Sequence, residues 1–90
     1  MKIECDIYFL EFIARKIRTA REKLHMSIEY LAHNAKMKAD YLGKIERAQA
    51  CPSSAYLLRI LWVLEVDLTT FFLDYKPPMK RDSEGHLYLI

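Results

Sequence analysis

Two short apolar patterns, separated by a brief polar break, constrain the fold of this sequence more than any other feature. The apolar residues of this stretch are Leu31, Ala32, Ala35, Met37, Leu42 and Ile45. Their spacing predicts one short helix over about 28–35 and another over 39–46, because each set falls on one helical face. Ala32 is small enough for close helix approach, and Met37 can fill the corner between the helices. We therefore expect a tight helix pair whose second member keeps one face free.

Three further helices are expected around this pair. Apolar residues recur at helical spacing from about 7 to 24 and predict a long amphipathic helix. The Pro-Ser-Ser sequence at 52–54 signals a fourth helix, which is so apolar up to residue 64 that we expect most of its faces to be covered. Asp67 is placed to cap a fifth helix from 68 to about 73. Five helices with short connections predict an all-α fold class.

One domain with a short tail is the expected organisation, since ninety residues suit one compact unit. We place the helical domain at 1–75, with 1–10 as an N-terminal extension, and a C-terminal tail at 76–90. Two prolines near the start of the tail forbid further helix. The apolar stretch 86–90 predicts a short strand. A hairpin within the tail, pairing in a dimer, or packing on the body would each cover it.

Charge and cysteine content bear on where the protein works. Residues 11–50 hold nine Lys or Arg residues against five acidic ones, whereas the whole chain carries only +2. This local excess suits an anionic partner. Cys5 and Cys51 are too few to staple a secreted fold, and we expect reduced thiols. The chain shows neither a signal-like start nor a membrane-spanning apolar run. We therefore expect a cytoplasmic protein without membrane contact.

Four stretches of the chain together resemble a known family. Residues 27–32, 41–47, 52–53 and 64–72 read SIEYLA, YLGKIER, PS and LEVDLTTFF, and their joint spacing is similar to that of the Xre or phage-repressor helix-turn-helix family. The resemblance implies a five-helix domain that binds double-stranded operator DNA. It also implies a homodimer with twofold symmetry, with the helix at about 39–46 in the major groove. On this basis the chain is expected to be a sequence-specific transcriptional regulator.

The same family pairs an arginine of the first helix with a glutamate at the end of the recognition helix. The matching residues here are Arg21 and Glu46, so the resemblance implies a structural salt bridge between them. The sequence departs from the family at three places. Lys36 stands where the turn glycine is usual, and we expect it to adopt an uncommon backbone conformation. Ala48 likewise replaces a frequent glycine, and Ile28 replaces a phosphate-contacting glutamine.

Candidate DNA-binding residues lie on and around the outward face of the helix at 39–46. They are Lys36, Lys38, Ala39, Asp40, Tyr41, Gly43, Lys44 and Arg47. Ala39 can touch a thymine methyl group, Asp40 can accept from cytosine, and Lys44 can donate to guanine. The lysines and Arg47, joined by Arg15 or Arg18, would supply salt-dependent attraction to phosphates. Because few of these side chains reach base edges, we expect modest specificity from base contacts alone.

Association with other protein chains is the remaining expectation. The candidates for a dimer interface are Leu61, Trp62, Phe71, Phe72 and Tyr88. The alternative function is a protein-interaction module with the same fold, such as an antitoxin-like or regulatory subunit. Neither the cysteines and histidines nor the acidic residues form a metal-ligand or catalytic pattern. We therefore expect no metal, no cofactor and no enzymatic activity.

Overall fold

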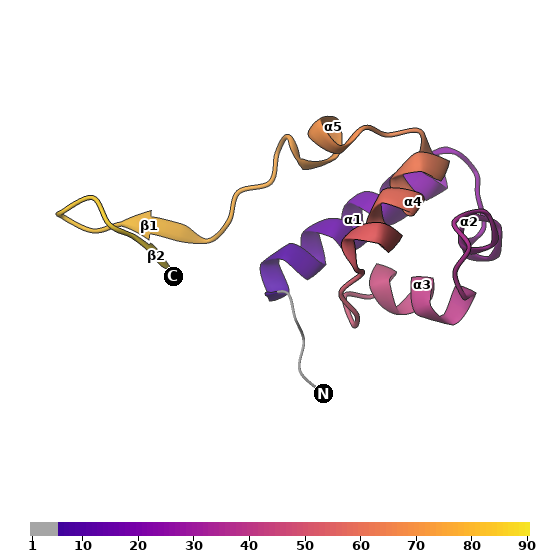
Figure 1. Ribbon diagram of the computed structural model, residues 1–90, viewed down its shortest axis with the longest axis horizontal. Helices are drawn as coiled ribbons and strands as arrows, with labels where there is room; N and C mark the ends of the chain where they lie inside the picture. The colour runs from indigo at the N-terminus through magenta and orange to yellow at the C-terminus, as the bar shows by residue number, and fades with distance from the viewer. Residues whose placement is uncertain (1–5) are drawn as a thin grey trace.

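The computed structural model describes residues 6–90, and residues 1–5 lie outside the described residues. The elements are α1 (Ile7–Lys23), α2 (Ile28–Asn34), α3 (Ala39–Glu46), α4 (Ser54–Leu64), α5 (Leu68–Phe72), β1 (Met79–Arg81) and β2 (Leu87–Leu89). The helices form one body, and the two strands project from it as a hairpin (Figure 1). The predicted all-α class with five helices and a short C-terminal strand is confirmed.

Side-chain caps set where four of the helices begin. Asp6, Ser27, Ser53 and Asp67 each accept a hydrogen bond from the backbone N–H three residues further along. Such a bond satisfies one of the donors that the first turn of a helix leaves unpaired. Helix α3 differs, because the side chain of its N-cap residue, Lys38, makes no capping bond. The position of α3 therefore depends on how it packs.

Left-handed residues set where helices α1 to α4 end. Positive φ angles between 57° and 59° occur at His25, Lys36, Ala48 and Glu65. After each, the next backbone N–H bonds to the carbonyl five residues back, as Gln49 does to Lys44 at 2.8 Å. This pattern is the Schellman motif, which glycine usually completes. The expected uncommon conformation of Lys36 is confirmed, and Ala48 shares it.

The core lies between α1, the α2–α3 pair and α4. Fully buried side chains come from each of these helices: Ile13, Ile17, Leu31, Leu42, Ile45 and Ile60. An aromatic cluster then packs α5 and the segment after it on α1, with Phe12 and Tyr75 ring centroids 4.9 Å apart. Asp74 accepts from Lys16 at 3.2 Å and ties the same segment to α1. The helical body is thus closed by its own side chains.

Helix α4 corrects the expectation that most of its faces are covered. Its buried residues, Leu57, Ile60, Leu61 and Leu64, share one face. On the other side, Leu58 is 52% exposed and Trp62 is 85% exposed. Burial follows the helical period rather than the total apolar content. The helix therefore leaves a large indole ring at the surface of the monomer.

The C-terminal hairpin is antiparallel and pairs Met79 with Leu89, Lys80 with Tyr88 and Arg81 with Leu87. Every residue from 79 to 90 is exposed. The hairpin extends away from the helical body (Figure 1). The strand expected within 86–90 is confirmed as β2, and the body does not cover it.

Three smaller expectations concern other parts of the chain. In the described part of the predicted N-terminal extension, Asp6 caps α1 and residues 7–10 belong to that helix. Leu10 is fully buried, so this segment is built into the body. Cys51 is not a free thiol in the structure, which departs from the expected reduced state, and Cys5 lies outside the described residues. No helix within residues 6–90 is long and apolar enough to cross a membrane.

Candidate nucleic-acid interface

Helix α3 presents two different faces. Leu42 and Ile45 are fully buried against the body, whereas Asp40 and Lys44 are exposed on the opposite side. Ala39 is half-buried at the start of the helix. The inner face therefore anchors the helix, and the outer face is available to a partner.

An ion pair fixes the end of α3 to α1. Arg21 donates from Nε to Glu46 Oε2 at 2.8 Å and from Nη2 to Glu46 Oε1 at 2.9 Å. The remaining terminal nitrogen of Arg21 donates to the Met26 carbonyl at 2.8 Å. The Arg21 side chain is 13% exposed and that of Glu46 only 4%. Hydrogen bonding to Glu46 raises the pKa of Arg21 above its ordinary value. The salt bridge that the family resemblance implied is present, and it is bidentate.

Arg18 strengthens the same junction. Its guanidinium donates to the backbone carbonyl of Glu46 at 3.2 Å. That carbonyl lies in the last turn of α3, where acceptors lack partners within the helix. Arg15 or Arg18 was expected to join the residues that attract DNA phosphates. The structure gives Arg18 a contact that holds α3 in place, and Arg18 is exposed.

A shallow hollow of about 310 Å³ lies over the outer face of α3. Its lining residues are Ile28, Glu29, Ala39, Asp40, Gly43, Lys44 and Arg47. Gly43 is buried, and a Cβ atom added there would lie 3.0 Å from a terminal nitrogen of Arg47. The Arg47 side chain, held by Gln49 at 3.1 Å, therefore lies over Gly43. Reaching Gly43 requires that Arg47 swing away.

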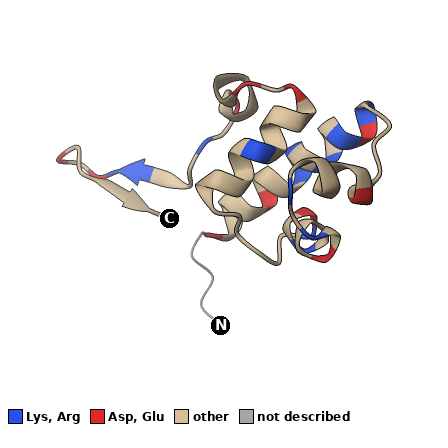
Figure 2. Cartoon of the chain, turned by 45° about the vertical axis from the view of Figure 1, so that its right-hand side comes forward, with Lys and Arg blue, Asp and Glu red and all other residues tan. Residues whose placement is uncertain are grey.

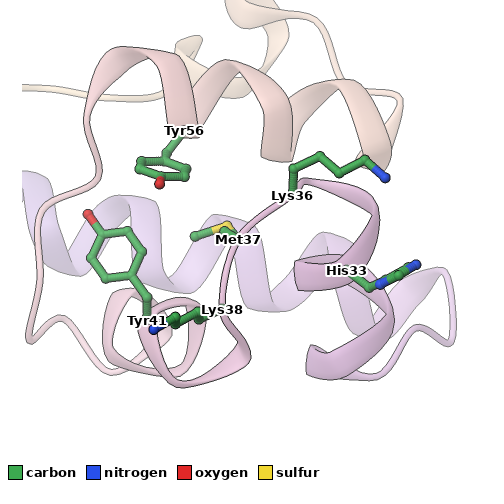
Figure 3. Close-up of a pocket in the computed structure, with 6 residues that line it drawn as sticks. All are labelled: His33, Lys36, Met37, Lys38, Tyr41 and Tyr56. Carbon is green, nitrogen blue, oxygen red and sulfur yellow. The ribbon is translucent and has the colours of Figure 1, made fainter.

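A second hollow, of about 660 Å³, lies beside the turn between α2 and α3. Its lining residues are His33, Lys36, Met37, Lys38, Tyr41 and Tyr56. Figure 3 shows the two tyrosine rings at one end and Lys36 and His33 at the other, with Met37 between them. None of these lining residues is acidic. Such a surface is attractive to an anion, including a backbone phosphate.

Tyr41 has a structural contact of its own in this hollow. Its hydroxyl donates to the Cys51 carbonyl at 3.2 Å, and its ring centroid lies 5.5 Å from that of Tyr56. Arg59 lies over the Tyr56 ring at 4.3 Å and donates to the Lys36 carbonyl at 3.3 Å. Sequence reasoning missed Tyr56 and Arg59 because no local pattern links α4 to the turn. Only the folded chain brings them together.

Charge is mixed over the helical body. Figure 2 shows Lys and Arg segments interspersed with Asp and Glu segments rather than gathered in one uniform patch. Around α3, Lys36, Lys38 and Lys44 are exposed together with Asp40. Positive charge around α3 is therefore local rather than spread over the whole helical body.

The five candidates for a dimer interface differ in how far the monomer already buries them. Leu61 and Phe71 are 3% and 1% exposed, so they belong to the core, because the monomer already covers them. Phe72 is half-buried and stacks on Phe12 with a centroid distance of 5.8 Å. Trp62 and Tyr88 are exposed at 85% and 48%. Only these last two offer a large free surface to a partner.

The arrangement of these helices is shared with known proteins. The sequence profile described as helix-turn-helix matches residues 17–71. Among solved structures, an HTH_3 family transcriptional regulator from Vibrio cholerae is 28% identical with a TM-score of 0.71. The match covers 78% of this chain and 39% of that one, so this chain spans well under half of that regulator's length.

Two restriction-modification controller proteins are similar over nearly their whole length. C.AhdI from Aeromonas hydrophila is 25% identical with a TM-score of 0.68, covering 71% of this chain and 97% of that one. Wild-type C.Esp1396I is 27% identical with a TM-score of 0.68, covering 78% and 90%. No curated protein sequence matches the chain. The profile match spans more than half of the residues, and the outward α3 lies inside it. The chain therefore belongs to the helix-turn-helix family of DNA-binding transcriptional regulators.

Proposed function

We propose that this protein binds operator DNA sequence-specifically as a twofold dimer, with α3 in the major groove of each half-site. The observation that carries the proposal is the anchoring of α3. Its inner side is held by Arg21 and Glu46, while Lys44 and Asp40 remain exposed on its outer side. A rigid helix with a free face suits a groove about 12 Å wide. The cytoplasm is the proposed location, because the proposed partner is the cell's own or phage DNA.

Base reading in this proposal falls to a small set of side chains. Lys44 donates to guanine, Asp40 accepts from the cytosine amino group, and the Ala39 methyl contacts thymine. Each protomer therefore reads few bases. A second protomer on the same duplex doubles the number of bases read, which is why we include twofold symmetry in the proposal.

Phosphate contacts complete the proposed interface. Lys36 and Lys38 line the hollow that contains no acidic residue, and Arg47 lies at the other edge of the outer face. We assign these three to the DNA backbone on either side of the groove. Tyr41 is assigned a supporting role, because its hydroxyl already bonds to the loop between α3 and α4.

The decisive experiment selects bound sequences from random duplex DNA. We expect enrichment of a palindromic site with two half-sites about one helical turn apart. Titrations at several salt concentrations then compare three variants. Lys44→Ala should relax specificity at one position and weaken binding by about 1–3 kcal/mol. Lys38→Ala should weaken all sequences alike and lower the salt slope by about one per protomer.

Lys76→Ala is the matched control, because it removes an exposed lysine outside both hollows. Its affinity and salt slope should equal those of the wild type. A wild-type protein that binds no duplex at low salt would overturn the proposed function.

A protein-interaction module is the second candidate function. The observation in its favour is Trp62, which is 85% exposed beside a hollow of about 390 Å³ that it lines with Leu61, Glu65, Val66 and Asp67. Exposed tryptophan is a frequent anchor of protein interfaces. Failure to bind duplex in the titrations above would favour this function.

A further inference from the structure

The C-terminal hairpin is exposed on all sides although it is rich in apolar side chains. Met79, Leu87, Tyr88, Leu89 and Ile90 are between 40% and 68% exposed. A hairpin of two strands is marginally stable in water and becomes stable when another strand or surface covers it. The hairpin projects away from the helices (Figure 1). Its cover must therefore come from outside the described part of this chain.

The two edges of the hairpin differ in how open they are. The β1 edge carries Lys80 and Arg81 and follows Pro77 and Pro78, features that discourage further strand pairing. One of its donors, the N–H of Met79, already bonds to the Pro77 carbonyl at 2.8 Å. The β2 edge reads Leu-Tyr-Leu and has no such protection. An incoming strand therefore meets an open edge only at β2.

The register shows which backbone groups of β2 face outward. The N–H of Ile90 bonds to the Pro78 carbonyl, and the N–H of Asp82 bonds to the His86 carbonyl. Because hydrogen-bonded pairs alternate in an antiparallel ladder, Lys80 and Tyr88 form the hydrogen-bonded pair between these two. Leu87 and Leu89 belong to the other kind of pair. Their N–H and C=O groups therefore point away from β1 to the open edge.

We propose that the β2 strands of two copies of this chain pair antiparallel about a twofold axis at Tyr88, giving one sheet of order β1-β2-β2-β1. The outward groups of Leu87 bond to the partner's Leu89, and those of Leu89 bond to the partner's Leu87. Tyr88 then faces the partner's Tyr88 across the axis, in the closer type of cross-strand pair. The inference rests on the proposed function only where it assigns the twofold seam of the DNA-binding dimer.

Self-complementarity favours a second copy over any other occupant. The edge offers outward groups at two positions placed symmetrically about Tyr88, so the same edge can serve as both partners. Met79, Leu87 and Leu89 lie on one face of the hairpin together with Arg81, and pairing joins the three apolar side chains of this face to those of its copy. Lys80 and Arg81 remain on the two outer edges. The β1 edges, which discourage strand pairing, then prevent further copies from adding to the sheet, so the assembly stays a dimer and does not extend into a fibre.

The test is a proline substitution that removes one outward N–H without touching a bond inside the hairpin. Leu89→Pro does this on β2. Arg81→Pro removes an outward N–H on β1, and it also removes the side-chain bond from Arg81 to the Gly85 carbonyl at 2.9 Å, so it is the more severe change to the hairpin itself. Sedimentation equilibrium of the full chain should show a dimer for the wild type and for Arg81→Pro. Leu89→Pro should weaken dimerisation about 30-fold or more, since symmetry removes two hydrogen bonds at once.

Trp62→Ala tests the competing surface, and it should leave the dimer intact. Circular dichroism of the two proline variants should show the wild-type helical melting transition, because the hairpin lies outside the helical core. Trp62→Ala should change it little, because Trp62 is 85% exposed. Three results would overturn the proposal: a monomeric wild type at about 100 µM, a Leu89→Pro protein that dimerises like the wild type, or loss of the dimer only in Trp62→Ala.

Duplex binding separates this inference from the proposed function. On a duplex with one half-site, Leu89→Pro should bind as tightly as the wild type, because α3 is unchanged. On the full palindrome it should bind more weakly, because the second protomer is no longer tethered. If no variant binds duplex while the dimer still depends on Leu89, the proposed function fails and the β2 seam stands.

Discussion

The helical body and the C-terminal hairpin are both built on backbone hydrogen bonds, yet they differ in what covers their side chains. In the body, Ile13, Leu42 and Ile60 are fully buried. In the hairpin, every residue is exposed. Hydrogen bonding therefore explains why each element forms, and burial explains which of them stands alone. The body holds α3 with its own side chains, whereas the side chains of the hairpin are left open to solvent.

The largest test of this contrast is Glu46→Ala in the body. It leaves the Arg21 guanidinium partly buried without its carboxylate, so the free energy of unfolding should fall by about 2–3 kcal/mol. Denaturant unfolding followed by circular dichroism measures this. Glu84→Ala is the control, since it removes a glutamate whose side chain is 78% exposed in the hairpin, and it should leave the midpoint unchanged. Equal stability of the two variants would mean that the ion pair does not anchor α3.

A smaller and opposite effect is expected from Ala48→Gly. Ala48 holds a φ of 58° at the end of α3, where glycine avoids a left-handed penalty of about 1–2 kcal/mol but loses more entropy on folding. The net gain should be about 0.5–1 kcal/mol in thermal unfolding. Ala50→Gly, in the same loop but without a positive φ, should destabilise slightly. A loss of stability in Ala48→Gly would show that this turn is set by packing rather than by its backbone.

The smallest effect on the body is expected from the hairpin turn. The backbone N–H of His86 bonds to Asp82 at 2.8 Å and lowers the pKa of that carboxyl below its ordinary value. The turn is therefore supported above the unfolded pKa of about 3.9 and weakened as pH falls through the lower folded value. Asp82→Asn at neutral pH should weaken cross-strand NMR contacts between β1 and β2. The melting of the helices should not change, and a shift there would mean that hairpin and body unfold together.

Much of the helical body could be predicted from the sequence because its determinants are local. The spacing of Leu42 and Ile45 predicts the bounds of α3, and Asp67 caps α5 as predicted. Trp62 was harder. The high apolar content of α4 suggested coverage on most faces, but the helical period places Trp62 opposite the buried face. There, composition was a poorer guide than periodicity.

The surroundings of the candidate site were less predictable because they depend on long-range packing. Arg59 reaches the Lys36 carbonyl across 23 positions in the chain, and Tyr56 meets Tyr41 only after α4 folds against the turn. Arg18, one of two arginines expected to help attract phosphates, also donates to a backbone carbonyl at the end of α3, which the sequence pattern did not indicate. Charge and residue type alone do not tell whether an arginine contacts DNA or supports a neighbouring helix.

The four left-handed helix ends have a consequence for how this protein can change. Backbone hydrogen bonds fix the direction of the chain at these four helix ends, which are His25, Lys36, Ala48 and Glu65. The tilt of α3 therefore does not depend on the side chains of its outer face. Residues such as Asp40 and Lys44 can then be exchanged without altering the angle at which the helix meets its target. In the proposed complex, a new operator preference would need only a few substitutions, and these would leave the architecture of the domain intact.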